Sequence, residues 1–140
     1  MEKISKSVNN LDLIIQNMNN VLSQSPHVVD DVYVDNGGVN IYLKKKVWGL
    51  FSGKTSYEFA IVDKDTPITN VISFTNKGSD GYTVSISDVN THIVSYSISL
   101  YEGDYGHNEI VCIYDQLESL YTKEADEKAK STIFDIFNIK

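Results

Sequence analysis

The start of the chain carries an apolar stripe with the spacing of an α-helix. Its positions follow one another at steps of four and three residues: Ile4, Val8, Leu11, Ile15, Met18 and Leu22. This spacing places the side chains on one side of a helix, and Ser25-Pro26 ends it. Such a stripe can form a coiled-coil seam between two copies, but over about three heptads we expect it to pack on the protein's own sheet.

From residue 28 to residue 101, apolar and polar positions alternate, which is typical of half-buried strands. Asn36-Gly37, between the first two alternating runs, predicts a β-hairpin. Turn residues also separate the later runs. We therefore expect an antiparallel meander of about five to six strands, drawn from residues 28–35, 39–47, 55–63, 68–76, 82–88 and 91–101.

The last predicted strand shows that the sheet should have two different faces. One phase of its alternation is apolar apart from its first position: His92, Val94, Tyr96, Ile98 and Leu100. The opposite phase is mostly serine. Antiparallel sheets commonly bury one face and leave the other in water, so we expect one core-facing and one polar face.

The C-terminal part of the chain returns to a helical pattern. Asn108 is a suitable N-cap for a long helix with an apolar stripe, and Ser131 is expected to cap a short second helix after the charged residues 123–130. The sequence therefore predicts a single α+β domain over residues 1–140. It has an N-terminal helix, the meander, and a long plus a short C-terminal helix, with the helices covering one sheet face.

The charge of the chain restricts its partners. A net charge of −7 over 140 residues argues against direct binding of nucleic acid and favours a protein with a basic surface, such as a nuclease or a nucleic-acid-binding effector. All 12 basic residues are lysine, so the chain lacks the planar guanidinium group of arginine, which binds phosphate through two hydrogen bonds. The Lys-, Asn- and Ile-rich composition indicates an AT-rich bacterial or phage genome.

Hydropathy bears on location and assembly. No run of residues has the length and apolar character of a membrane span, and the N-terminus lacks a signal-peptide pattern. We therefore expect a cytoplasmic protein that does not bind membranes, as a monomer or a homodimer.

One segment imitates a phosphate-binding motif. Residues 48–55 read WGLFSGKT and end like a P-loop, but the first glycine of that motif would have to stand where the chain has Trp48. The residues that follow alternate like a strand, whereas a P-loop opens a helix. We interpret the segment as a glycine-containing connection between two antiparallel strands and expect no cofactor.

Catalytic chemistry has one candidate location. His107 stands in YEGDYGHNE beside Glu102, Asp104 and Glu109, a combination that can supply a general base or a weak metal site. No nucleophile lies at a recognisable spacing from it, so we expect no catalytic residues and no metal. Cys112 has apolar neighbours and is expected to be a small buried hydrophobe.

The remaining candidates suggest a binding surface. Trp48 and Phe51 follow three lysines, and they either cap the core or anchor a partner at a protruding hairpin tip. Acidic residues in predicted loops and turns could face a basic cleft in that partner. The full set of candidate partner-binding residues is Asp30, Asp31, Asp35, Trp48, Phe51, Glu102, Asp104, Tyr105, His107 and Glu109.

These features favour a small acidic non-enzymatic protein that binds and inhibits another macromolecule. In general composition the chain resembles polymorphic-toxin immunity proteins and phage anti-defence proteins, although no motif carries that likeness. One alternative is a small-molecule-binding protein, or a small hydrolase, that uses the polar sheet face and the His107 loop. Another is an acidic dimeric secretion chaperone, whose subunits would associate through the first helix.

Overall fold

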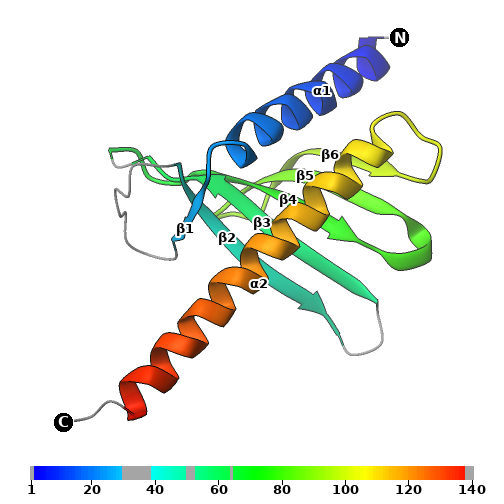
Figure 1. Ribbon diagram of the computed structural model, residues 1–140. Helices are drawn as coiled ribbons and strands as arrows, with labels where there is room; N and C mark the ends of the chain where they lie inside the picture. The colour runs from blue at the N-terminus through cyan, green and yellow to red at the C-terminus, as the bar shows by residue number, and fades with distance from the viewer. Residues whose placement is uncertain (1, 30–38, 50–52, 64, 138–140) are drawn as a thin grey trace.

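The computed structural model describes residues 2–29, 39–49, 53–63 and 65–137, with the backbone alone at 2–9, 124 and 126–137. Two helices lie on one face of a six-stranded sheet (Figure 1). The elements in chain order are α1 (Glu2–Leu22), β1 (His27–Val29), β2 (Asn40–Trp48), β3 (Lys54–Ile61), β4 (Asn70–Asn76), the 3-10 turn η1 (Gly78–Asp80), β5 (Tyr82–Asp88), β6 (Val94–Leu100) and α2 (His107–Phe137).

The sheet is mixed, with spatial order β1-β2-β3-β4-β5-β6. Strands β2 to β6 are antiparallel, as expected from the short turns between the alternating runs. Strand β1 instead runs parallel to β2, with His27 opposite Asn40, so a strict meander is wrong. Alternation reports which residues are buried but not the direction of pairing, and a parallel pair needs a longer connection than a hairpin. The predicted hairpin turn at Asn36-Gly37 lies outside the described residues.

The core fills the space between the sheet and the helices. In α1 its buried positions are Leu11, Ile14, Met18 and Val21, while Ile15 and Leu22 are partly buried. The first helix therefore packs on its own sheet, as expected. The other buried core residues are Ile41, Leu43, Tyr57, Phe59, Phe74, Val84 and Leu100 from the strands, and Ile110, Ile113, Tyr114 and Leu117 from α2.

The C-terminal region forms one helix, not two. α2 continues to Phe137, so Ser131 lies inside it and the expected short second helix is wrong. Residues 123–130 are rich in Ala, Lys and Glu, which have high helix propensity, and the charged segment therefore continues the helix. Over the described residues, neither helix is long and apolar enough to cross a membrane.

Aromatic rings connect α2 to the sheet. Tyr57 lies edge-to-face with Tyr114, with ring centroids 5.3 Å apart, and with Tyr121 at 5.9 Å. Tyr82 continues the series, at 5.5 Å from Tyr114 and 5.7 Å from His107. Such edge-to-face pairs contribute about 0.5–1.5 kcal/mol beyond their burial. The series therefore fixes the position of α2 along strands β3 and β5.

The opposite face of the sheet carries hydroxyl groups and no helix. Ser73, Ser85 and Ser97 form one row across β4, β5 and β6. In the neighbouring row Thr83 and Ser99 lie with their hydroxyl oxygens 3.1 Å apart. This face therefore carries the predicted serines, although Ala60 and Val71, which also lie on it, are buried.

Candidate functional site

The connection between β6 and α2 is held in one shape by Asp104. Its carboxylate Oδ2 accepts a hydrogen bond from the backbone N–H of Tyr101 at 2.8 Å. Its own N–H donates to the Tyr101 carbonyl at 2.9 Å, and its carbonyl accepts from the N–H of His107 at 3.1 Å. These bonds close residues 101–107 into a defined turn that leads directly into α2.

The turn also packs against α1. The Tyr105 hydroxyl donates to Asp12 Oδ1 at 2.7 Å, a bond that raises the pKa of Tyr105. Gly106, which precedes α2, has φ of +85°. A Cβ at this position would lie 2.7 Å from Leu11 Cδ2, so glycine permits both the left-handed backbone and the close approach of α1.

Acidic side chains surround this turn. Asp12, Glu102, Asp104 and Glu109 are exposed, and none forms an ion pair within the part of the chain that is described. Tyr105 stands among them with 63% of its surface exposed. These five residues are called the acidic turn surface below. The structure thus brings together Glu102, Asp104, Tyr105 and Glu109 from the predicted set and adds Asp12.

His107 borders this surface but faces a different neighbour. Its half-buried ring packs edge-to-face on Tyr82, and its Nδ1 lies 3.5 Å from Asn108 Oδ1. Among the described residues, no cluster of three or more His, Cys, Asp or Glu side chains could hold a metal ion. The ring is therefore positioned by aromatic contact, without a carboxylate partner in the described structure.

Cys112 lies further along α2, and its predicted burial is wrong. It is exposed, although Ile110 and Ile113 on either side are fully buried. In a helix, successive residues are rotated by about 100°, so apolar sequence neighbours do not imply a shared face. The thiol therefore points away from the core.

Trp48 lies at the end of β2, on the polar face. Its indole Nε1–H donates to Ser56 Oγ at 2.7 Å, and the Lys46 ammonium lies 3.8 Å from the ring centroid. The side chain remains 44% exposed. The alternation places Lys45 on the other face, where its ammonium lies 6.0 Å from the Tyr121 ring centroid. Trp48 is thus held by a hydrogen bond and a cation on the polar side of the sheet.

Trp48 does not join the acidic turn surface. The register places both at the same end of the sheet, but β2 and β6 are separated by four strand spacings, or about 19 Å. Phe51 and the three aspartates Asp30, Asp31 and Asp35 lie outside the described residues. The predicted set therefore contains at least two separate patches, one basic and aromatic on β2–β3 and one acidic at the start of α2.

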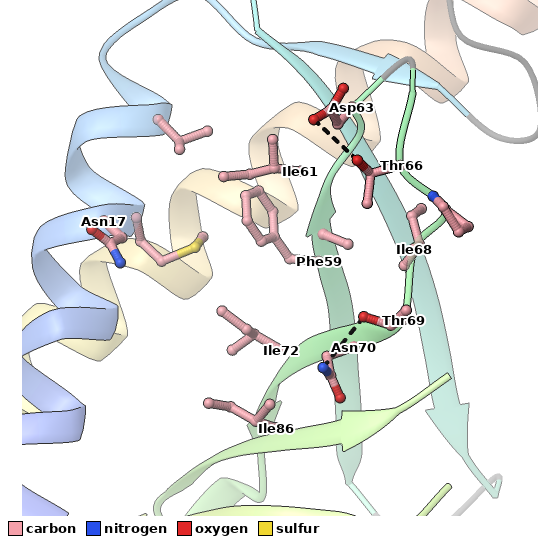
Figure 2. Close-up of a pocket in the computed structure, with 14 residues that line it drawn as sticks. Asn17, Phe59, Ile61, Asp63, Thr66, Ile68, Thr69, Asn70, Ile72 and Ile86 are labelled. Carbon is pink, nitrogen blue, oxygen red and sulfur yellow. Dashed lines mark hydrogen bonds between the residues drawn. The ribbon is translucent and has the colours of Figure 1, made fainter. Parts of the chain in front are cut away.

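An apolar pocket of about 450 Å³ opens between α1, the ends of β3 and β4, and the connection 63–69 (Figure 2). Ile61, Ile72 and Ile86 point from the sheet toward α1 in Figure 2, and Asn17 and Asn70 stand at the border of the pocket. Asp63 is the one charged residue among those lining it, and its carboxylate accepts from the Asp65 N–H at 3.1 Å. The apolar lining residues are Met18, Val21, Phe59, Ala60, Ile61, Pro67, Ile68, Ile72 and Ile86.

Sequence reasoning missed both Asp12 and this pocket. Asp12 is the only acidic residue between positions 3 and 29, so it could have been singled out from the sequence. No sequence pattern near it, however, predicts its contact with Tyr105. The pocket residues read as ordinary core positions, since alternation cannot show where the helix leaves the sheet uncovered. Comparisons of the chain with protein-family models, with curated proteins and with solved structures find no match.

Proposed function

We propose that the protein is a non-enzymatic inhibitor that binds a basic protein through the acidic turn surface. The observation that carries this proposal is the group of four carboxylates around the exposed Tyr105, which form no ion pair with any described side chain. Unpaired carboxylates attract a basic partner and orient it. Tyrosine is enriched at binding hot spots because it covers much area with few rotatable bonds.

The rigidity of the turn supports the same proposal. Asp104 fixes the backbone, and Asp12 fixes the Tyr105 hydroxyl before any partner arrives. A surface that is already ordered loses less conformational entropy on binding. The partner best suited to it is a nuclease or nucleic-acid-binding effector, whose basic cleft would accept carboxylates in place of phosphates.

The test combines partner capture with charge reversal. The immobilised protein captures its partner from the native host, a salt gradient elutes it, and mass spectrometry identifies it. We expect Glu102→Lys with Glu109→Lys to slow association with that partner about tenfold at low salt, because steering depends on these charges. The measurement is association kinetics by surface plasmon resonance.

A matched control carries the same change of net charge elsewhere. Glu58→Lys with Asp65→Lys alters a strand position on the polar face and a turn beyond β3. Association should then slow much less than with the pair on the acidic turn surface. If both double variants slow association equally, the effect is a general one of net charge. If Glu102→Lys with Glu109→Lys leaves the association rate unchanged, the proposal is refuted.

The apolar pocket favours a second function, the binding of a small molecule. Its volume lies within the range of ligand sites, and its lining is apolar with neutral amides and hydroxyls at the border. Among the described lining residues Asp63 carries the sole charge, so a neutral or amine-bearing apolar ligand suits the pocket better than an anion. This site lies on the helix side of the sheet, away from the polar face and from His107.

Nile red, a neutral apolar dye, provides the probe for this second function. We expect its fluorescence to rise on binding, and Ile61→Lys to weaken binding about tenfold by placing a charge at the pocket. Val47→Lys is the matched control, since Val47 is 61% exposed and Ile61 54% exposed, but Val47 is not among the pocket residues. Equal loss in both variants, or no binding by the wild type, would contradict the small-molecule function.

A further inference from the structure

The outer edge of the sheet at β6 is protected against pairing only by a bulge near its start, where Tyr96 pairs with Ile86 and Val94 with Ser87. At the other edge, three described residues form β1. Strand β6 has seven, VSYSISL, with no charge and no proline. Edge strands are normally protected by charges, prolines, bulges or brevity, because their free N–H and C=O groups can pair with another chain. The bulge of β6 lies at Ser95, so the strand is regular from Tyr96 to Leu100. Within the described structure β5 is the only strand that pairs with β6.

We propose that two copies of the chain pair through β6, antiparallel, around a two-fold axis at Ser97. In this register Ser97 faces its own counterpart, and Tyr96 faces Ile98 of the second copy. Directly opposed residues of an antiparallel pair share a face of the sheet, so at the centre of the seam Tyr96 meets Ile98 and serine meets serine. The match ends at Ser95, where a bulge interrupts β6 and places Val94 opposite Ser87 of the polar face.

Exposed apolar side chains also lie at both ends of the strand. Ile93 and Tyr101, which flank β6, are 68% and 54% exposed. Val94, at the start of the strand, is 54% exposed. Pairing would therefore cover apolar surface that a single copy leaves in water, with a favourable free energy of about 25 cal/mol per Å².

Charge favours this edge over other surfaces for self-association. Each copy carries a net charge of −7, so two copies repel one another in general. Like charges that face one another directly across strands are destabilising, but β6 contributes none to the new ladder. The occupant best suited to this uncharged strand, which is self-complementary around Ser97, is therefore a second copy of the chain.

The paired state changes what the protein presents to others. The two sheets would join into one, and the hydroxyl row of Ser73, Ser85 and Ser97 would continue across the axis. The two acidic turn surfaces follow the ends of β6, so antiparallel pairing places them at opposite ends of the seam. This inference does not depend on the proposed partner, since self-association is measured on the purified protein alone.

Ser97→Lys provides the first test. It places two lysines opposite each other at the axis, and we expect the dimer dissociation constant to rise at least tenfold (about 1.4 kcal/mol) in sedimentation and native mass measurements. Ser85→Lys is the matched control, because Ser85 lies opposite Ser97 on the same face but on an inner strand. A wild type that stays monomeric at submillimolar concentration overturns the proposal, as does equal dissociation in both variants.

A cysteine pair provides a second test that does not depend on a bulky charge. In a Cys112→Ser background, Ser97→Cys should form a covalent dimer on mild oxidation, because directly opposed Cα atoms in a ladder lie within disulfide range. Ser85→Cys in the same background should remain monomeric on a non-reducing gel. Cross-linking that is equal at both positions, or absent at Ser97, would overturn the proposed register.

Discussion

Gly81→Ala should lower the free energy of unfolding by about 2–4 kcal/mol, because two independent costs add. Gly81 has φ of +82° and ψ of −151°, a region of backbone space that is essentially restricted to glycine. An added Cβ would also overlap the carbonyl oxygen of Leu100 and lie 3.2 Å from Tyr101 Cδ1. A backbone atom cannot rotate away as a side chain can, so the turn or β6 must move.

Gly78→Ala is the matched control, three residues earlier in the same connection. Its φ of +66° is also positive, but nothing lies within 4 Å of an added Cβ. We expect it to cost about 1 kcal/mol, the backbone term alone. Urea unfolding of both variants measures the difference. Equal losses would show that the contact with Leu100 contributes nothing, and a neutral Gly81→Ala would contradict the backbone argument as well.

The strands could be predicted from the sequence because burial alone determines their pattern. Val84, Ile98 and Leu100 alternate with polar residues, and each lies on the face that alternation assigns to it. His92 shows where this reasoning fails. It follows the same phase but lies in the turn before β6, exposed and with φ of +62°.

The reason for this failure is a local competing hydrogen bond. The Asp88 carboxylate accepts from the N–H groups of both Asn90 and Thr91 at 2.8 Å. Such an aspartate offers the backbone an alternative to the strand ladder, so the turn extends further and β6 begins only at Val94. The same bonds lower the pKa of Asp88.

The acidic turn could be predicted only as far as its residues are neighbours in the chain. Glu102, Asp104, Tyr105 and Glu109 stand within one short segment, so any compact turn keeps them together. Asp12 is 93 residues away from Tyr105, and no periodicity predicts that contact. Predicting the pocket requires still more information than the sequence pattern holds, because the pocket depends on how α1 crosses strands β3, β4 and β5.

Stability should fall as the pH rises from 10 to 12, because Tyr57 is buried as a neutral phenol. Burial, then the nearby Tyr114, Glu118 and Tyr121, raise the pKa of Tyr57 from 10.0 to about 12. Between these two values the unfolded chain has lost the proton and the folded chain keeps it. The free energy of unfolding therefore falls by about 1.4 kcal/mol per pH unit, or about 2.7 kcal/mol in total, from this residue alone.

The direction of this pH dependence follows from which state, folded or unfolded, keeps the Tyr57 proton. Below pH 10 both states are protonated at Tyr57, so its contribution is fully present there and is lost toward pH 12. Burial raises the pKa of Tyr82, Tyr96 and Tyr114 in the same direction, so the wild-type slope should exceed one proton. Tyr57→Phe keeps the ring but removes the ionisable hydroxyl, and urea unfolding across this pH range should then show a slope smaller by about one proton. If the free energy of unfolding of Tyr57→Phe depends on pH as steeply as that of the wild type, the prediction is contradicted. The Tyr57 hydroxyl would then ionise without unfolding the protein.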